Sequence, residues 1–174
     1  MKAGPTFAAR AKAIRLLILD VDGVLTDGRL VYGPAGEELK VFHVQDGLAI
    51  VGAQRSGLIV AVISGRASPA VSRRMADLGV LEVHQGTDDK EAVLDALLRR
   101  RRVTPRETAY MADDLPDLPL LRRVGLALAP ANAAAEVKRV VHWVGRRAGG
   151  QGAVREAVET ILKARGSWPP PESA

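Results

Sequence analysis

Residues 14–23 read IRLLILDVDG, and this stretch decides the fold. Its first six residues form an almost continuous apolar run, which is typical of a strand buried on both faces of a parallel sheet. The run stops at two carboxylates, Asp20 and Asp22, and Gly23 gives the backbone the freedom to turn sharply after them. We therefore predict a parallel sheet with an acidic cluster at the carboxyl end of one of its strands.

Apolar strands alternate with amphipathic helices along the rest of the chain. This alternation predicts an α/β fold built on a doubly wound parallel sheet, in which ligands bind at the carboxyl ends of the strands. Further strands are expected at 58–63, 80–83, 108–111, 125–129 and 141–144. Helices are expected at 47–56, 68–79, 90–102, 118–123, 133–139 and 153–164.

The segment between Asp22 and the first of these helices departs from the alternation. Residues 30–32 and 39–44 can pair across a turn at 33–36, which contains two glycines and a proline and predicts a β-hairpin. About two dozen residues are available here, too few for a separate cap domain. We therefore expect a hairpin flap and no cap domain.

The composition limits the number of domains, the possible metal ligands and the association with membranes. With 174 residues and 47% hydrophobic content, the chain has the size of one domain, which we place at 1–166, followed by a Pro-rich tail at 167–174 that we expect to be disordered. The chain has no cysteine, so metal chemistry must use oxygen or imidazole ligands. No apolar run reaches the ~18 residues of a membrane span. We expect no membrane partner, with a cytoplasmic location as the default.

The net charge of +5 suits either a nucleic acid or an anionic substrate. Part of the excess lies in the arginine run 99–102, which reads as a solvated helix end because cations there face the negative end of the macrodipole. Only 3% of the residues are aromatic, which offers little surface for stacking bases. We therefore expect no nucleic acid partner and favour an anionic small molecule.

A second acidic group follows another predicted strand. Its sequence, DDLPD, supplies Asp113, Asp114 and Asp117. Carboxylates gathered at one edge of a sheet repel each other unless a cation bridges them. Oxygen ligands favour Mg²⁺, which takes one or two protein carboxylates together with water and phosphate oxygens. The sequence therefore points to a magnesium site shared by the two acidic groups.

Two further residues complete a set suited to phosphate. Ser64 follows the strand at 58–63 with a hydroxyl and neighbouring amides, and Lys90 opens a helix whose amides favour anions. Each motif alone has a plainer interpretation: DxDG is also a turn with Asx hydrogen bonds, the second acidic group is also a helix start, and Lys90 is also a surface lysine. The combination favours phosphate chemistry.

In this order the motifs resemble those of the haloacid dehalogenase superfamily of aspartate-nucleophile phosphatases, which has a Rossmann-like core. LILDVDGVLTDG, VISGR, DKEA and MADDLPDLP correspond to its DxD, Ser/Thr, Lys and acidic motifs. DGVLTDG, the hairpin in place of a cap, SGRASP and AGGQGAVRE resemble a narrower family, the 3-deoxy-D-manno-octulosonate 8-phosphate phosphatases. That resemblance implies an enzyme of lipopolysaccharide precursor synthesis and a homotetramer in which hairpins pack together.

The resemblance also implies roles for the acidic residues. Asp20 is expected to attack phosphorus and form an aspartyl phosphate, while Asp22 protonates the leaving sugar oxygen and then activates water. Asp20, the backbone carbonyl of Asp22 and Asp113 are expected to hold Mg²⁺. Asp114 and Asp117 are expected to act behind these ligands or through water.

For the substrate, the resemblance implies a second group of residues. Ser64, the neighbouring amide of Gly65 and Lys90 are expected to bind the transferring phosphoryl group. Arg66 offers a planar fork for the substrate carboxylate, although an ion pair at the surface is an equal alternative. Arg155 belongs to a tail segment expected to close over the site, and the same segment also reads as a flexible helix lead-in.

Two positions depart from the family pattern. Ala112 stands where the acidic motif normally begins with glycine, so we expect a crowded backbone approach or a conformation that alanine resists. Pro69 stands three residues after Arg66, where related phosphatases for nine-carbon nonulosonates carry lysine, and this favours the eight-carbon substrate.

Other functions stay open at this point. One alternative is a phosphatase for another acidic sugar phosphate, such as a nonulosonate 9-phosphate. Another is a phosphate-binding regulatory module without turnover. A receiver-type signalling domain is disfavoured because its acidic pair precedes its phosphoacceptor aspartate, whereas DxD comes first in this chain.

Overall fold

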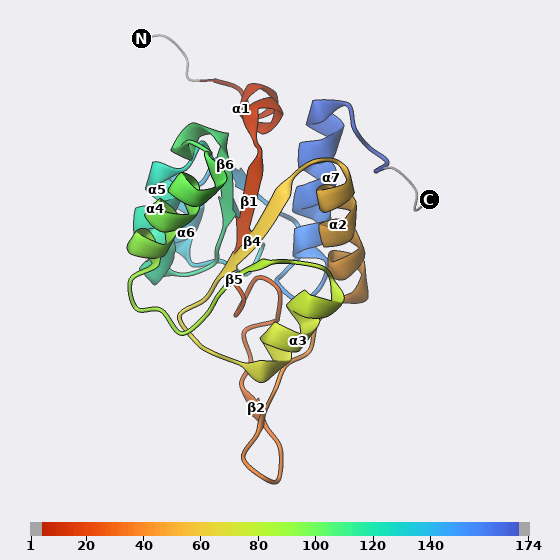
Figure 1. The fold of residues 1–174 in the computed structure, drawn as a ribbon, viewed down its shortest axis with the longest axis vertical. Coiled ribbons are helices and arrows are strands. Elements are labelled where there is room, and N and C mark those ends of the chain that lie inside the picture. Colours follow the sequence, from red (N-terminus) through yellow and green to blue (C-terminus); the bar gives the residue numbers. More distant parts are fainter. Residues whose placement is uncertain (1–4, 171–174) are drawn as a thin grey trace.

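A six-stranded parallel sheet forms the centre of the molecule (Figure 1). The computed structural model describes residues 5–170. The strand order is β5-β4-β1-β6-β7-β8, and every neighbouring pair is parallel. The strands are β1 (Leu16–Leu19), β4 (Ile59–Ile63), β5 (Glu82–His84), β6 (Thr108–Met111), β7 (Leu126–Ala129) and β8 (Trp143–Val144).

The order of the strands creates the place for a site. From β1 the chain moves to β4 and β5 on one side, then crosses to β6, β7 and β8 on the other. The direction therefore reverses between β1 and β6, where Leu19 pairs with Met111. In open α/β sheets a ligand crevice forms at such a switch point, outside the carboxyl ends of the strands. The two acidic motifs follow these two strands directly.

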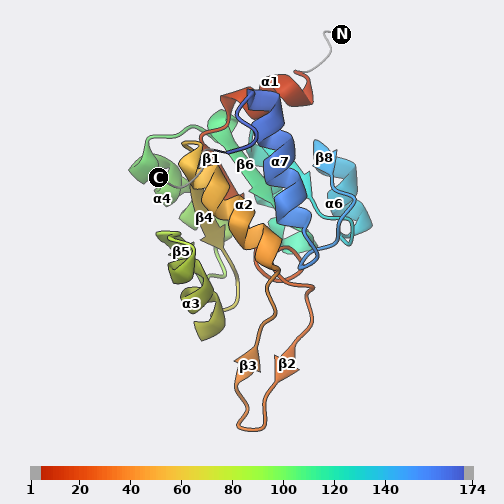
Figure 2. The same cartoon turned by 90° about the vertical axis from the view of Figure 1, so that its right-hand side faces the viewer.

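Helices cover both faces of the sheet, as Figures 1 and 2 show. Two apolar clusters lie under them, one on each face. β1 is buried along its whole length because it contributes alternate side chains to both clusters. One face carries α1 (Phe7–Ala13), α2 (Val44–Arg55), α3 (Pro69–Asp77) and α7 (Ala153–Arg165), and the other carries α4 (Lys90–Arg101), α5 (Leu118–Arg123) and α6 (Ala135–Val140).

A hairpin leaves the core between β1 and α2 and projects beyond the carboxyl edge of the sheet (Figure 2). It consists of β2 (Val31–Tyr32) and β3 (Glu38–Leu39), and the described chain between β1 and α2 holds no other domain. The predicted second strand at 39–44 is wrong beyond Leu39, because only two residue pairs form and Val44 already begins α2. The hairpin without a cap domain is as predicted.

Other elements differ from the predictions in detail. α1 was not expected from the sequence; its N-cap is Thr6, whose hydroxyl accepts from the Ala9 amide at 3.3 Å. β5 begins at Glu82 rather than at 80, and it pairs with β4 from that residue onward. Two short 3-10 helices, η1 (Pro105–Glu107) and η2 (Leu115–Asp117), precede β6 and α5.

The tail prediction falls partly outside the described residues, since 171–174 are not described. In the described part, Trp168 packs against the apolar core, and the guanidinium of Arg155 lies 4.7 Å from the centre of its ring. The segment up to 170 therefore lies against the domain instead of extending from it. Within residues 5–170, no helix has the length and hydropathy needed to cross a bilayer. The cytoplasmic location stays a prediction.

Candidate active site

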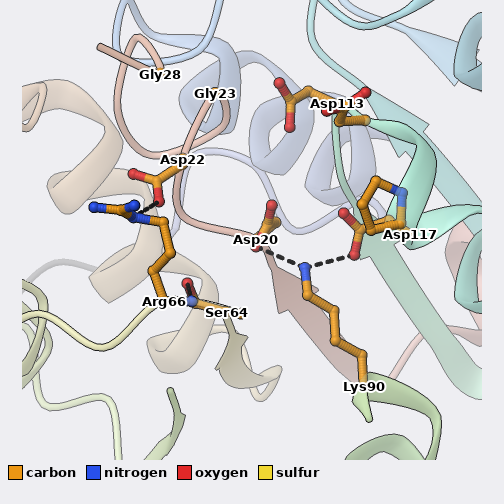
Figure 3. Close-up of a pocket in the computed structure, with 12 residues that line it drawn as sticks. Asp20, Asp22, Gly23, Gly28, Ser64, Arg66, Lys90, Asp113 and Asp117 are labelled. Atoms are coloured by element: carbon orange, nitrogen blue, oxygen red, sulfur yellow. Dashed lines mark hydrogen bonds and ion pairs between the residues drawn. The ribbon is translucent and has the colours of Figure 1, made fainter. Parts of the chain in front are cut away.

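A cavity of about 340 Å³ opens at the carboxyl ends of β1, β4 and β6. Loops after these strands and the start of α4 supply its walls, as the switch point of the sheet requires. Figure 3 shows the labelled side chains converging on it from these separate segments. The lining residues are Asp20, Asp22, Gly23, Gly28, Ser64, Gly65, Arg66, Lys90, Asp113, Asp114, Pro116 and Asp117.

Asp20 lies at the base of the cavity. Its amide donates to the carbonyl of Met111 at 3.0 Å and so extends the ladder between β1 and β6. Asp20 is 7% exposed, and its carboxylate accepts from Lys90 Nζ at 3.1 Å. Burial, reinforced by the charge of Asp117, raises the pKa of Asp20 to about 7, although Lys90 opposes the rise. A further cation beside Asp20 would favour its ionised form.

Lys90 is held by a chain of buried polar groups. Its ammonium donates to Asp117 Oδ1 at 2.7 Å as well as to Asp20. The hydroxyl of Tyr110, a fully buried residue of β6, donates to the same oxygen of Asp117. The two carboxylates raise the pKa of Lys90 and outweigh the effect of burial, which lowers it. Lys90 is thus a fixed cation facing the nucleophile position, as dashed lines mark in Figure 3.

Asp22 lies on the other side of the cavity and turns toward the hairpin. Its Oδ1 accepts from Lys40 Nζ at 2.5 Å, and its Oδ2 lies 3.5 Å from Arg66 Nε. Glu38 pairs with both cations, with Oε1 2.8 Å from Lys40 Nζ and Oε2 bound to the Arg66 guanidinium. Asp20 and Asp22 therefore lie in separate environments. Asp20 contacts Lys90, whereas Asp22 contacts Lys40 and Arg66.

Asp113 reaches the cavity from the loop after β6. A Cβ built on Gly23 would fall 2.0 Å from Asp113 Oδ2, so a larger residue would displace the Asp113 side chain, and the φ of +78° at Gly23 itself favours glycine. Burial, with the charges of Asp114 and Asp117, raises the pKa of Asp113 to about 6. Asp114 itself is exposed and caps η2 by accepting from the Leu115 amide at 2.8 Å.

The acidic groups fit a magnesium ion that is only partly held by protein. Asp20, Asp113 and Asp117 face one cation, Lys90, so negative charge is in excess, and burial opposes ionisation of the first two. Among the described residues, no three acidic, histidine or cysteine side chains lie close enough together to hold a metal by themselves. Mg²⁺ suits this arrangement because it takes few carboxylates and completes its shell with water, carbonyl and phosphate oxygens.

Ser64 and Gly65 form the wall contributed by β4. The Ser64 amide continues the sheet by donating to His84 O at 2.8 Å, and the side chain is 3% exposed. Its hydroxyl accepts from the Arg66 amide at 3.3 Å. Gly65 lines the cavity beside it. This loop presents a hydroxyl at the same edge as Lys90, as a phosphate site requires.

Arg155 does not line this cavity. Its guanidinium lies over Trp168 and is 3.5 Å from Glu159, while its amide donates to Asp46 Oδ1 at 2.7 Å. It borders a different, polar cavity of about 410 Å³ beside the start of α7. Within the described chain, the expected contact of Arg155 with the site is therefore not formed, because Trp168 and Glu159 occupy its charged end.

The tail segment preceding α7 does touch the site loop, but through its backbone. Gly150 N donates to Val24 O at 3.1 Å. Asn132 links the two loops, accepting from Gly149 N at 2.7 Å and donating to Gly23 O at 3.0 Å. A Cβ on Gly149 would lie 1.9 Å from Gly23 O, which explains why this position is glycine. The segment braces the turn after Asp22.

Ala112 causes none of the expected strain. Among the described non-glycine residues, only Arg102 has a positive φ, so position 112 does not need the conformation that glycine favours. The Ala112 methyl is fully buried in the apolar cluster under α4 and α5, and its amide donates to Leu128 O at 3.2 Å. The substitution is accommodated by the core.

Four functional neighbours were missed from the sequence: Glu38, Lys40, Tyr110 and Asn132. Glu38 and Lys40 read as ordinary polar residues of a hairpin, and their contacts depend on how the hairpin folds back. Tyr110 carried a signal, since it is one of two tyrosines in the chain and lies between two apolar residues in a buried strand. A buried Tyr hydroxyl needs a polar partner.

Comparisons with known proteins agree with this geometry. Residues 76–156 match the family model of haloacid dehalogenase-like hydrolases. The chain is 45% identical over 166 residues to the 3-deoxy-D-manno-octulosonate 8-phosphate phosphatase KdsC of Escherichia coli strain K12, covering 94% of this chain and 88% of that enzyme. The chain belongs to the 3-deoxy-D-manno-octulosonate 8-phosphate phosphatase family.

Solved structures support the assignment to this phosphatase family. The 3-deoxy-D-manno-octulosonate 8-phosphate phosphatase from Moraxella catarrhalis, in complex with magnesium ion, phosphate ion and KDO, has a TM-score of 0.90 and 40% identity over 92% of each chain. A probable YrbI family phosphatase from Pseudomonas syringae has a TM-score of 0.91 and 48% identity, also over 92% of each chain. The predicted family, the α/β fold and the classification as a phosphatase are confirmed.

Proposed function

We propose that this phosphatase hydrolyses the 8-phosphate ester of 3-deoxy-D-manno-octulosonate 8-phosphate, using Mg²⁺ and an aspartyl phosphate on Asp20. The observation that carries the proposal is the position of Asp20, buried at the base of the cavity with Lys90 on one side and the loop of Asp113 beside it. The relationship to the E. coli enzyme supports the choice of substrate.

The chemistry divides between the two aspartates. A carboxylate oxygen of Asp20 attacks phosphorus, and the bond from phosphorus to the sugar oxygen breaks as Asp22 gives that oxygen a proton. Asp22 then takes a proton from the water that attacks phosphorus of the aspartyl phosphate, releasing phosphate and restoring Asp20. Lys90 and the Ser64 hydroxyl bind the phosphoryl oxygens, where charge spreads in the transition state.

Mg²⁺ would be held by Asp20, the backbone carbonyl of Asp22 and Asp113. When bound, it supplies positive charge to the phosphoryl oxygens and to the ionised nucleophile. Asp117 would support this arrangement by holding Lys90 in place. Asp114 would support it by capping η2, which follows Asp113 in the same loop.

Substrate choice would depend on Arg66, which is half-exposed at the cavity rim. Its guanidinium already pairs with Glu38 and Asp22, so a substrate carboxylate would bind to the donors that these two side chains leave exposed. A phosphatase for another acidic sugar phosphate uses the same chemistry, so only the substrate separates the two candidates. Arg155 remains part of the proposal only as a residue offered to a neighbouring copy, since it faces away from the cavity of its own chain.

A homotetramer is proposed from the hairpin. Several large apolar side chains on and beside it are exposed, which is unusual for a surface that meets only water. In the family, hairpins of neighbouring subunits are expected to pack together, and this contact would cover them. The exposed side chains are Leu30, Val31, Tyr32, Leu39 and Val41.

The proposed function is tested by phosphate release from a panel of sugar phosphates, with and without Mg²⁺, for the wild type and Asp20→Asn. We expect the highest kcat/KM for the eight-carbon acid phosphate, no activity after chelation of metal, and a loss of at least about 10³-fold in Asp20→Asn. A higher kcat/KM for a nonulosonate 9-phosphate would change the assigned substrate to that compound, and activity retained by Asp20→Asn would overturn the mechanism.

A further inference from the structure

The hairpin contributes a buried lysine to the site, and none of the four motifs contains it. Lys40 directly follows β3, and its side chain is only 2% exposed although it carries an ammonium group. Removing an ammonium from water is costly unless carboxylates compensate it. Here two do, Asp22 Oδ1 at 2.5 Å and Glu38 Oε1 at 2.8 Å.

These residues belong to a closed ring of four alternating charges. Asp22 contacts Lys40, Lys40 contacts Glu38, Glu38 contacts Arg66, and Arg66 returns to Asp22 with Nε 3.5 Å from Oδ2. Lys40 donates a hydrogen bond to Oδ1 of Asp22, whereas Arg66 Nε lies 3.5 Å from Oδ2 and makes only a longer ion-pair contact. The hydrogen bond to a buried ammonium restricts the rotation of the carboxyl group and leaves Oδ2 as the oxygen that can carry the proton.

The two ring members from the hairpin lie two residues apart on its returning strand. Glu38 belongs to β3 and Lys40 follows it, while Asp22 and Arg66 come from the loops after β1 and β4. The hairpin is otherwise a thin two-stranded extension with few contacts to the core (Figure 2). The position of β3 relative to the core and the orientation of Asp22 are therefore coupled through Lys40.

We propose that Lys40 is a positioning residue that directs the Asp22 carboxylate toward the leaving-group oxygen. This inference deepens the proposed function and rests on it, since it assigns Asp22 the transfer of a proton to that oxygen. It also gives the hairpin a role within its own subunit: any contact that moves β3 alters the geometry of proton transfer. Glu38 pairs with both Lys40 and Arg66 and so fixes the positions of these two cations relative to each other.

The proposal has a kinetic signature that general destabilisation of the fold lacks. A sugar alkoxide leaves slowly without a proton, whereas p-nitrophenolate leaves readily without one. The ratio kcat/KM covers binding and transfer of the phosphoryl group to Asp20, and it excludes the later attack of water. A defect in proton transfer to the leaving oxygen therefore lowers kcat/KM for the sugar phosphate selectively.

The test compares the wild type with Lys40→Met on 3-deoxy-D-manno-octulosonate 8-phosphate and on p-nitrophenyl phosphate, both with saturating Mg²⁺. We expect Lys40→Met to lower kcat/KM by about 100-fold on the sugar phosphate, the lower end of general acid effects, and by less than about threefold on p-nitrophenyl phosphate. Lys163→Met is the matched control, because this exposed lysine of α7 pairs with Glu159 on its own helix and, among residues 5–170, with no other acidic side chain. It should change neither value.

A double-mutant cycle then asks whether Lys40 acts through Asp22. Adding Lys40→Met to Asp22→Asn should cause no further loss on the sugar phosphate, because the oriented carboxylate is already gone. Equal losses on both substrates, or full additivity with Asp22→Asn, would overturn the proposal. If Lys40→Met fails to fold, Lys40→Gln, which keeps a polar side chain of similar length, is judged by the same two criteria.

The same data separate the inference from the function on which it rests. A wild-type protein that releases no phosphate from the sugar acid phosphate with Mg²⁺ contradicts the proposed function. An active wild type whose Lys40→Met variant shows no selectivity between the two leaving groups contradicts only the role of Lys40.

Discussion

Asp113 illustrates how a single residue makes the stability of the metal-free protein depend on pH. Its pKa is raised to about 6, above the value of 3.8 for an unperturbed aspartate, because it is partly buried beside Asp114 and Asp117. Between these pH values the folded state keeps a proton that the unfolded state has lost. Its contribution to stability is therefore present at low pH and is lost as the pH rises through about 6.

We predict that Asp113→Asn stabilises the protein at pH 8 without metal. The asparagine removes a carboxylate that is repelled by its neighbours, and since the site is partly open to water we expect a gain of only about 1 kcal/mol, or roughly 2–4 °C in Tm. The gain should shrink toward pH 4, and added Mg²⁺ should raise Tm more for the wild type. Thermal unfolding across this pH range, with Asp77→Asn as an exposed control, checks this; a lower Tm for Asp113→Asn at pH 8 contradicts it.

Tyr110 is predicted to act on Lys90 through Asp117. Tyr110→Phe removes the hydroxyl that donates to Asp117, leaving a buried carboxylate with one fewer partner at a cost of about 1–3 kcal/mol in the free energy of unfolding. Lys90 should then be held less firmly, lowering kcat/KM by roughly 3- to 10-fold at the low end of that range. Heat unfolding and steady-state kinetics measure both effects, and unchanged values for both would refute a supporting role.

At the scale of elements, the strands and most helices could be predicted because their apolar patterns are local. The helix α1 and the limits of the hairpin could not, because they depend on packing: α1 lies against α7, and β3 ends where its partner strand ends. That Asp20, Asp22, Ser64, Lys90 and Asp113 line one cavity could be predicted, because each follows a strand or opens a helix. The contacts of Lys40 with Asp22 and of Arg155 with Trp168 join segments far apart in the sequence and leave no local pattern.

The loop before α7 gives a prediction at this scale. Gly149→Ala places a methyl group 1.9 Å from Gly23 O. The backbones of Gly149 and Gly23 are both hydrogen bonded to the Asn132 side chain and cannot easily move apart. The turn after Asp22 must shift, and we expect kcat/KM to fall at least about tenfold, as a 1.4 kcal/mol perturbation would cause. Gly145→Ala is the control, because its nearest contact is a Trp143 side-chain atom at 3.0 Å; equal activities for the two variants would contradict this account.

At the scale of the whole molecule, the fold joins a compact parallel sheet to a projecting two-stranded hairpin. The parallel sheet brings the loops after β1, β4 and β6 to one edge because parallel strands all end there. The hairpin extends from this edge (Figure 2), and several of its apolar side chains are exposed to solvent. The cavity is lined by the loops of the core, and the hairpin reaches the site through the contacts of Lys40 and Glu38 with Asp22 and Arg66. These contacts link the site to whatever packs on the hairpin.

We predict that Leu30→Glu disrupts the proposed tetramer. Leu30 is 47% exposed beside β2, and a carboxylate there cannot be buried between hairpins without a large desolvation cost. Light scattering after gel filtration should give a tetramer mass for the wild type and a smaller mass for the variant. Leu81→Glu, at an exposed leucine outside the hairpin, should retain the wild-type mass, and a monomeric wild type would refute the assembly.

The central claim is that Asp20 becomes covalently phosphorylated, and acid quenching followed by peptide mass spectrometry tests it most directly. Asp22→Asn is mixed with p-nitrophenyl phosphate and Mg²⁺, because this ester can phosphorylate Asp20 without an acid while the water step lacks its base. We predict that the peptide containing Asp20 gains the mass of one phosphoryl group, and that Asp20→Asn gains none. Release of p-nitrophenol without a phosphoryl group on Asp20, or a phosphoryl group on another residue, would contradict the account.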